Sequence, residues 1–318
     1  MTPPPQASTE ALLVASSPAS TLQRSTTAMM RLCSRLAHKS EIATELFQSF
    51  RRLFFESAHP NLISTVRPQL ANGVLLIVQN NVLHLSRTAG IWELTVDLIA
   101  LVACAQHAAL SLAALEHLVL HSPPFSERSL CSCLGTLRVL LLDSGPLDQE
   151  VQSSALQLAI TLHRMLCEQQ AAHDSTAWPV LAEEVLRLVS DACWSGVLAE
   201  CVSVEAIRAL PSIILLGGSS PLALNPAQLM SLLKSALLPT LHQLQASAVG
   251  RARMVAGLDS LQRALVHALP EIVHLDKFEL VWRSSLLVLA GFSRLDSSLD
   301  DEVCACAVWL VWWLGVVC

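Results

Sequence analysis

Apolar residues recur three and four positions apart along almost the whole chain from about Ala19 onward, and Gly and Pro fall mainly at the ends of these segments. This spacing places apolar side chains on one face of an α-helix. No stretch alternates apolar and polar residues between turn residues, which is the pattern of a half-buried strand. The sequence therefore predicts an all-α fold. Residues 1–18, rich in Pro, Ser and Thr, are expected to form a disordered leader.

The boundaries of the helices follow from capping residues and breaks. Ser40, Asp148 and Asn225-Pro226 are expected N-terminal signals. Clusters of Pro, Gly and Ser at 122–124, 143–146 and 217–221 are expected breaks. The predicted helices cover residues 19–37, 40–57, 60–86, 91–105, 108–121, 126–142, 147–170, 177–194, 196–216, 225–246, 249–268, 277–294 and 299–317.

The composition narrows the class of protein. Hydrophobic residues make up 53% of the chain and charged residues 14%. Burial can therefore offset the entropy lost on ordering, which argues against a disordered chain. The formal charge of −6 leaves no excess of cations for phosphates, which argues against a nucleic-acid site built on a basic surface.

The cysteines and the N-terminal residues indicate a compartment. Ten Cys in 318 residues are too sparse for a disulfide scaffold, and most lie in apolar helical segments, where free Cys behaves as a small hydrophobe. The first thirty residues lack the pattern of a secretory signal, and the chain contains no Asn-x-Ser/Thr site. We therefore expect an intracellular protein, cytoplasmic or nuclear.

One pattern recurs at intervals of about fifty residues. Asp148-x-Glu150-Val151-x3-Ala155-Leu156 returns as Asp300-x-Glu302-Val303-x3-Ala307-Val308, and looser versions occupy 204–211 and 255–261. The valines at 151, 204, 255 and 303 are separated by 53, 51 and 48 residues. Such recurrence, with two helices per unit, favours stacked helical hairpins. Acids in the first turn complement the helix dipole, and small Ala lets the next helix approach closely.

This pattern resembles HEAT-type repeats, although Gln152 and Cys304 stand where the family usually has Arg after the Val. Residues 208–214 and 265–273 also look like helices of the DNA-damage-checkpoint kinases related to phosphatidylinositol 3-kinase. The resemblance implies an irregular HEAT- or armadillo-like α-solenoid over residues 19–318, either complete or as a fragment of a larger array.

The function expected of such an α-solenoid is that of a non-catalytic intracellular scaffold that binds protein partners through stacked helices. Three alternatives remain: the N-terminal helical fragment of a large checkpoint-type kinase, a membrane-associated helical protein anchored by 303–318, and an enzyme with an unrecognised helical active site. No residue stands out as catalytic, cofactor-binding or metal-binding, and neither a cofactor nor a small-molecule substrate is indicated.

The nearest approach to a metal site is His117-x3-His121 followed by Cys131-x-Cys133. Two imidazoles and two thiolates are a ligand set for Zn²⁺. Within a helix, however, the Cys-x-Cys spacing directs the thiols to nearly opposite sides, and the histidines fall at a helix C-terminus, where imidazoles cap carbonyls. We therefore expect no metal there, and still less at Cys304-x-Cys306, which has no nearby His.

The sequence also contains one basic strip and two short acidic runs. The first two helices carry a mildly basic strip, which is either a partner-binding surface or, more simply, a solvated face. The acids Glu183-Glu184 and Asp300-Asp301-Glu302 are expected at helix starts, where they serve the helix dipole rather than acid–base chemistry. The basic strip consists of Arg24, Arg31, Arg35, Lys39, Arg51 and Arg52, partly offset by Glu41 and Glu45.

Two apolar runs raise the question of a membrane. Residues 98–115 carry no charge, but Gln106 and His107 lie at their centre, which favours two shorter buried helices joined near 106–108. Residues 303–318 are wholly apolar and contain three Trp, as a short membrane anchor would. The end of a truncated helical array would leave a similar run.

Overall fold

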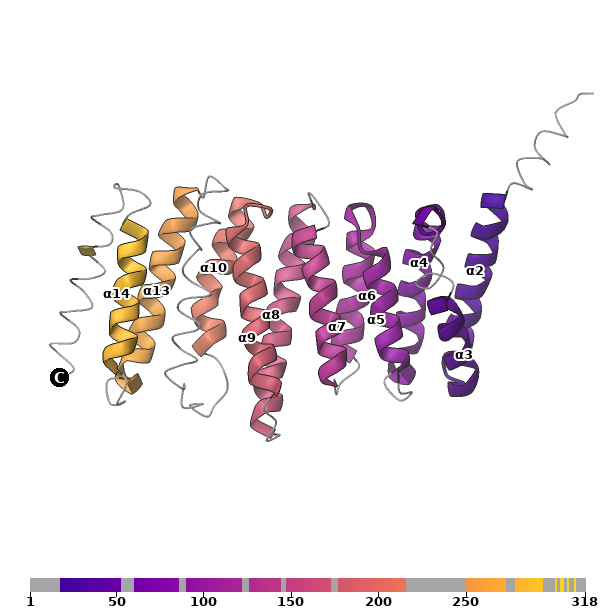
Figure 1. The fold of residues 1–318 in the computed structure, drawn as a ribbon, viewed down its shortest axis with the longest axis horizontal. Helices are drawn as coiled ribbons and strands as arrows, with labels where there is room; N and C mark the ends of the chain where they lie inside the picture. The colour runs from indigo at the N-terminus through magenta and orange to yellow at the C-terminus, as the bar shows by residue number, and fades with distance from the viewer. Residues whose placement is uncertain are drawn as a thin grey trace, which may run out of the picture. The chain divides into compact units, whose positions relative to one another are not determined.

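A computed structural model describes residues 18–52, 60–85, 90–121, 126–143, 147–172, 177–215, 250–272 and 278–293, together with five single residues between 301 and 312 (Figure 1). Every regular element in these ranges is a helix, so the chain is all-α. The α-helices are α2 (Pro18–Leu36), α3 (Ser40–Arg51), α4 (Pro60–Leu85), α5 (Ile91–Val102), α6 (Ala108–His121), α7 (Glu127–Arg138), α8 (Gln149–Ala172), α9 (Ala177–Trp194), α10 (Glu200–Leu215), α13 (Arg251–Ile272) and α14 (Phe278–Ser293).

Most predicted boundaries agree with these helices to within two residues, but the helix predicted from residue 196 is wrong at its start. Gly196 has φ of 78°, a left-handed conformation that Gly adopts without a steric penalty. It follows the last residues of α9, in the manner of a C-terminal glycine, and α10 begins only at Glu200. The glycine therefore ends one helix instead of beginning the next.

Two other expectations about helix ends need correction. Lys39, not Ser40, occupies the N-cap position of α3, with extended φ and ψ of −97° and 97° and no side-chain cap. The helix predicted over 126–142 is α-helical only to Arg138 and continues as a π-helical turn over Val139–Asp143. The Asp148 signal is confirmed: the residue precedes α8, and its carbonyl oxygen accepts from the Gln152 amide (3.0 Å). The predicted helix over 225–246, most of 299–317 and the leader up to residue 17 lie outside the described residues.

The uncharged run at 98–115 is divided between two helices, as its sequence predicts. α5 ends at Val102, because Ala103 and Cys104 take up extended backbone conformations. A single 3₁₀ turn, Ala105–His107, then leads into α6. Within the described part of the chain, we find no helix with the combination of length and hydropathy needed to cross a bilayer.

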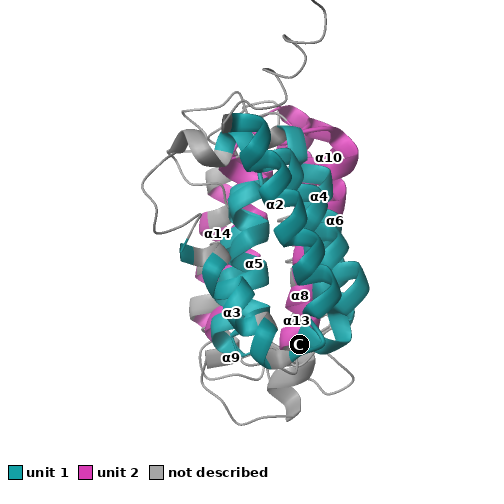
Figure 2. Ribbon diagram, turned by 90° about the vertical axis from the view of Figure 1, so that its right-hand side faces the viewer, with its two compact units in different colours: residues 1–140 teal, residues 141–318 magenta. Residues whose placement is uncertain are grey.

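The chain divides into two compact units, residues 1–140 and 141–318 (Figure 2). In unit 1, each helix packs against the helix two places along the chain. α2, α4 and α6 form one layer, and α3, α5 and α7 form a second. Successive helices connect the layers, so that hydrophobic side chains from both are buried between them.

In unit 2, α10 packs against α8, α9 and α13, and α13 packs against α14. Three of the four recurring valines fall near the starts of helices: Val151 in α8, Val204 in α10 and Val255 in α13. Val303 lies outside the described residues. The fifty-residue recurrence therefore places corresponding residues on helices that are neighbours in space, α8 beside α10 and α10 beside α13.

Buried polar side chains connect the beginnings of these neighbouring helices. Gln152 of α8 accepts through Oε1 from the Ala199 amide (2.8 Å) and donates through Nε2 to the Leu147 carbonyl oxygen (3.0 Å). From the other side, Arg253 of α13 donates to the Leu198 carbonyl oxygen (2.9 Å). Backbone groups just before α10 are thus satisfied by side chains from both neighbours, which fixes the lengthwise register of the three helices.

Replacing Gln152 with leucine is expected to destabilise unit 2 by about 2 kcal/mol. The side chain is 4% exposed, and its loss leaves a partly buried amide and a partly buried carbonyl without these partners. Q157L is the matched control, because Gln157 is exposed on the same helix and its replacement should change stability by less than about 0.5 kcal/mol. Urea unfolding followed by far-UV circular dichroism measures both, and equal losses in the two variants would contradict the role given to Gln152.

Candidate functional site

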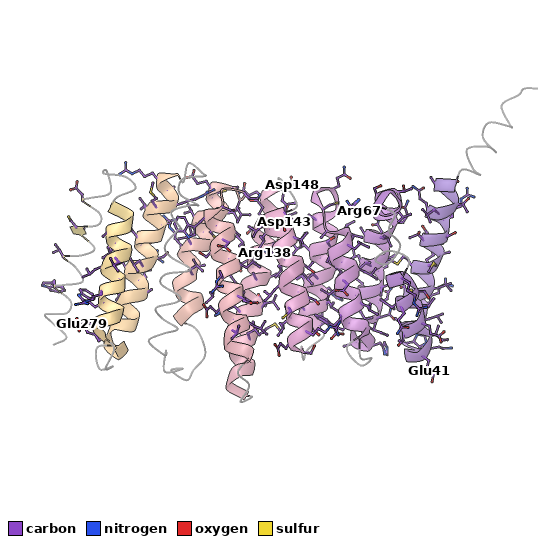
Figure 3. All side chains as sticks on the ribbon, viewed as in Figure 1. Glu41, Arg67, Arg138, Asp143, Asp148 and Glu279 are labelled. Carbon is purple, nitrogen blue, oxygen red and sulfur yellow. The ribbon has the colours of Figure 1, made fainter. Side chains whose placement is uncertain are left out.

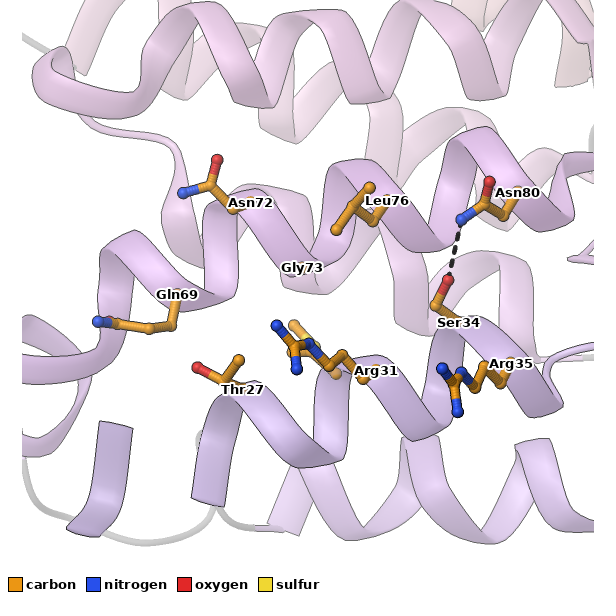
Figure 4. A pocket seen from close by; sticks show the side chains of 10 residues that line it. Thr27, Arg31, Ser34, Arg35, Gln69, Asn72, Gly73, Leu76 and Asn80 are labelled. Atoms are coloured by element: carbon orange, nitrogen blue, oxygen red, sulfur yellow. Dashed lines mark hydrogen bonds between the residues drawn. The ribbon is translucent and has the colours of Figure 1, made fainter. Parts of the chain in front are cut away.

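A groove of about 410 Å³ lies between α2 and α4 in unit 1 (Figure 4). Ligand sites in proteins commonly have volumes of about 300–1,000 Å³. The residues from each helix recur at spacings of three and four, so each set comes from a single helix face. The lining consists of Thr27, Met30, Arg31, Ser34 and Arg35 of α2 and Gln69, Asn72, Gly73, Leu76 and Asn80 of α4.

A close approach of the two helices lies in the middle of the groove. Gly73 is buried, and a Cβ atom placed on it would lie 2.5 Å from Cγ and 2.7 Å from Cβ of Met30. Real Cβ contacts are not this short. Glycine is therefore required at position 73 for α2 and α4 to pack at this distance.

Side-chain hydrogen bonds hold α2 and α4 parallel on either side of this contact. Near the helix starts, Gln23 Nε2 donates to the Thr65 carbonyl oxygen (3.1 Å). Further along, Asn80 Nδ2 donates to Ser34 Oγ (3.1 Å), as Figure 4 shows, and Asn81 Nδ2 donates to the Ser34 carbonyl oxygen (2.7 Å). Asn81 is 5% exposed. These bonds satisfy polar groups at the interface and give the groove walls a defined register.

The charge of the groove is wholly positive. α2 and α4, with 19 and 26 residues, contain no Asp or Glu but carry four Arg, at positions 24, 31, 35 and 67. Among the residues that the structure describes, neither Arg31 nor Arg35 forms an ion pair, and both are exposed. The acids in the described helices of unit 1 belong to the other four: Glu41, Glu45, Glu93, Asp97, Glu116 and Glu127. Figure 3 labels one residue of each charge in this unit, Glu41 on α3 and Arg67 on α4.

This separation of charge extends to the whole chain. Unit 1 contains 10 Lys and Arg against 8 Asp and Glu, whereas unit 2 contains 10 against 18. The units therefore carry net charges of +2 and −8, which together give the −6 of the chain. The net negative charge of the protein therefore comes from unit 2. In unit 1, the two helices that line the groove, α2 and α4, carry charged side chains of positive sign only.

The groove brings together only part of the predicted basic strip. Arg31 and Arg35 line it, whereas Arg24, Lys39 and Arg52 are exposed outside it; the side chain of Arg51 is outside the described residues. Sequence reasoning missed the amides on the opposite wall, Gln69, Asn72 and Asn80. A signal was present, because amides at helical spacing interrupt an otherwise apolar helix.

The residues considered for a metal site do not converge. His117 and His121 are adjacent on α6, with ring centroids 4.5 Å apart, and burial together with the charge of His121 lowers the pKa of His117. On α7, Cys131 is exposed and Cys133 is fully buried, as the helical spacing predicts, and burial raises the pKa of the Cys133 thiol. No group of three or more potential ligands occurs in the described part of the chain. Cys304 is exposed, and Cys306 is outside that part.

The expectation that Glu183-Glu184 begins a helix is wrong. They are the seventh and eighth residues of α9, whose first residue is Ala177. Glu183 Oε1 accepts from Arg187 Nη2 (3.0 Å), one helical turn further on. Both side chains of this pair are substantially exposed, so the pair adds little stability. Asp300 and Glu302 are outside the described residues.

His163 in α8 is a buried titratable group that should make unit 2 sensitive to acid. Burial lowers the pKa of His163 to about 4 from an ordinary 6.5. Between these values the unfolded chain takes up a proton that the folded chain does not, so stability is retained above pH 6.5 and falls as the pH is lowered. The loss reaches roughly 2–3 kcal/mol by about pH 4.5.

The variant H163Q should remove most of this loss. Urea unfolding at about pH 7.5 and about pH 4.5 gives the difference for each protein, and H121Q, at an exposed histidine of α6, is the matched control. An acid-induced loss of equal size in H163Q and the wild type would show that His163 is not its source.

No family model, curated protein or solved structure matches this chain.

Proposed function

We propose that this chain is a non-catalytic intracellular scaffold, cytoplasmic or nuclear, whose helical hairpins stack as a HEAT-like α-solenoid and bind protein partners. The observation that carries the proposal is the packing of helices that are not consecutive in the chain, α2 against α4, α4 against α6 and α8 against α10, together with the packing of α10 against α13. A hairpin has apolar surface on both sides, and stacking buries it while leaving a long row of helices exposed.

Side-chain hydrogen bonds between the starts of neighbouring helices support the same proposal. In unit 1, Ser129 Oγ at the start of α7 donates to Glu93 Oε1 (2.9 Å) at the start of α5. In unit 2, Gln152 and Arg253 bond to the backbone just before α10. Each link aligns the N-terminal ends of two helices that pack against each other, α5 with α7, α8 with α10 and α10 with α13. Repeated parallel alignment of this kind is what a stack of hairpins requires.

Solution scattering tests the stacked architecture. A compact globular chain of 318 residues has a radius of gyration of about 20 Å. One continuous stack is elongated, so we expect a clearly larger value from small-angle X-ray scattering of the monodisperse protein. A radius near 20 Å would contradict a single solenoid.

Photo-crosslinking tests whether the exposed helices bind proteins. Leu76 and Leu83 of α4 and Leu120 of α6 are 50%, 64% and 46% exposed. When photo-leucine is incorporated into the full chain in cells, these positions should crosslink to other proteins. The fully buried Leu70 and Leu115 serve as internal controls, since they can react only within the chain. If the exposed leucines also give only intramolecular crosslinks, the scaffold proposal is wrong.

A further inference from the structure

We infer that the groove between α2 and α4 binds an extended acidic peptide segment of a partner protein, with two carboxylates on Arg31 and Arg35 and the peptide main chain along α4. The inference rests on the proposed function, for which it names a site and a partner chemistry.

The positive charge of the groove favours an anionic ligand. Arg31 and Arg35 form no ion pair with a described residue, and neither groove helix contains an acid. Guanidinium groups pair with carboxylates through two parallel hydrogen bonds, which gives geometric selectivity as well as attraction. An anionic side chain placed here meets two cations and no competing carboxylate from the groove walls.

The opposite wall offers acceptors. Asn72 Nδ2 donates to the Pro68 carbonyl oxygen (3.0 Å), and Asn80 Nδ2 donates to Ser34 Oγ. These bonds leave the amide oxygens of Asn72 and Asn80 as acceptors, and no described residue donates to either. Gln69 Oε1 is buried and has no hydrogen-bond partner among the described residues. Three acceptors along one wall suit the successive backbone N–H groups of a peptide, whereas a phosphatidylserine headgroup offers a single ammonium group as donor.

The spacing of these residues matches an extended chain. Arg31 and Arg35 are four residues apart on a helix, or about 6 Å along its axis. Alternate side chains of an extended peptide lie about 6.6 Å apart on the same side. Asn72 and Asn80 are about 12 Å apart along α4, the length of roughly four extended residues. The groove therefore selects the pattern acid-x-acid.

The same features disfavour other anions. Lipid-binding surfaces use clusters of about 4–8 Lys and Arg, and the affinity of DNA-binding proteins comes largely from Lys and Arg that neutralise many phosphates, about 6–10 in strongly salt-dependent cases. The groove has two cations, and Leu76 adds apolar surface to its lining. A short peptide with two carboxylates and neighbouring apolar side chains fits this lining.

Peptide selection on the full chain tests the inference. Random octapeptides displayed on phage are panned against the wild-type protein, and the enriched sequences are synthesised with a fluorescent label for anisotropy titrations. We expect enrichment of acid-x-acid, with at least tenfold weaker binding when both acids are replaced by their amides. The double variant R31E/R35E should weaken binding by at least tenfold, and N72L by severalfold.

The matched control is R24E/R52E, which makes the same change in charge within unit 1 at exposed cations outside the groove. It should alter affinity by less than twofold at physiological salt, where longer-range attraction is screened. Circular dichroism and the unfolding midpoint confirm that each variant is folded. The inference is overturned if R24E/R52E weakens binding as much as R31E/R35E, if no acidic pattern is enriched, or if phosphatidylserine vesicles bind through Arg31 and Arg35 while peptides do not.

The two proposals can fail separately. Intermolecular photo-leucine crosslinks together with peptide binding that ignores Arg31 and Arg35 would retain the scaffold and reject the groove. Groove-dependent peptide binding without any protein crosslink in cells would retain the peptide site and reject the scaffold.

Discussion

Replacing Trp194 with alanine is expected to destabilise unit 2 by about 3–5 kcal/mol, a large part of the stability of an ordinary domain. Trp194, the last residue of α9, is fully buried. Among the fully buried side chains of the described residues, it has the largest volume. Truncation removes its buried apolar surface and leaves a cavity that the packed helices can only partly fill. Urea unfolding followed by far-UV circular dichroism measures the loss.

V180A on the same helix is the control for this experiment. Val180 is 58% exposed, so its truncation should change the free energy of unfolding by less than about 0.5 kcal/mol. W194F, which retains an aromatic ring, should fall between the two. A loss below about 1 kcal/mol in W194A would mean that Trp194 is not packed as described.

The second large effect is expected at Gly73. The variant G73A should destabilise unit 1 by about 1–3 kcal/mol, even though alanine is the better helix former by about 1 kcal/mol. The added methyl would lie 2.7 Å from Cβ of Met30, an atom that cannot rotate away, so α2 and α4 must separate. We also expect weaker binding of acidic peptides, since the same displacement widens the groove.

G135A is the control, because it makes the same substitution at a helix position where no other atom is close to the added methyl group. Gly135 is exposed in the middle of α7, and a Cβ atom there would meet nothing within 4 Å. Its replacement should stabilise unit 1 by up to about 1 kcal/mol through helix propensity alone. The two glycine variants should therefore shift the unfolding midpoint in opposite directions. Shifts in the same direction would contradict the close packing of α2 on α4.

Helix positions could be predicted from the sequence because the apolar spacing and the breaks agree locally. The division of residues 98–115 into two helices followed from the polar pair Gln106 and His107 at its centre. Predictions failed where the backbone conformation of one residue decided the boundary. Gly196 ends α9 with positive φ, and Lys39 takes the N-cap position before Ser40. A glycine after one helix and before the next is compatible with either role in the sequence.

The groove was harder to foresee for a different reason. Its cations could be predicted because Arg31 and Arg35 are four residues apart on a recognisable helix. Its amide wall belongs to α4, and the two lining residues nearest in sequence, Arg35 of α2 and Gln69 of α4, are 34 residues apart. Single-helix periodicity does not reveal which helix becomes the neighbour of α2, or that Gly73 permits contact there.

The side-chain hydrogen bonds that join helices packed side by side also determine how the chain can reach its folded state. They connect residues between 33 and 55 positions apart, from Ser126 with Glu93 to Arg253 with Leu198. Closing loops of this length costs little more entropy than closing shorter ones, and contacts of low sequence separation favour rapid folding. At a synthesis rate of about 5–20 residues per second, a new helix follows its partner by roughly 2–11 s. Each helix can therefore dock while the chain is still being made, before its apolar face has long been exposed to other proteins.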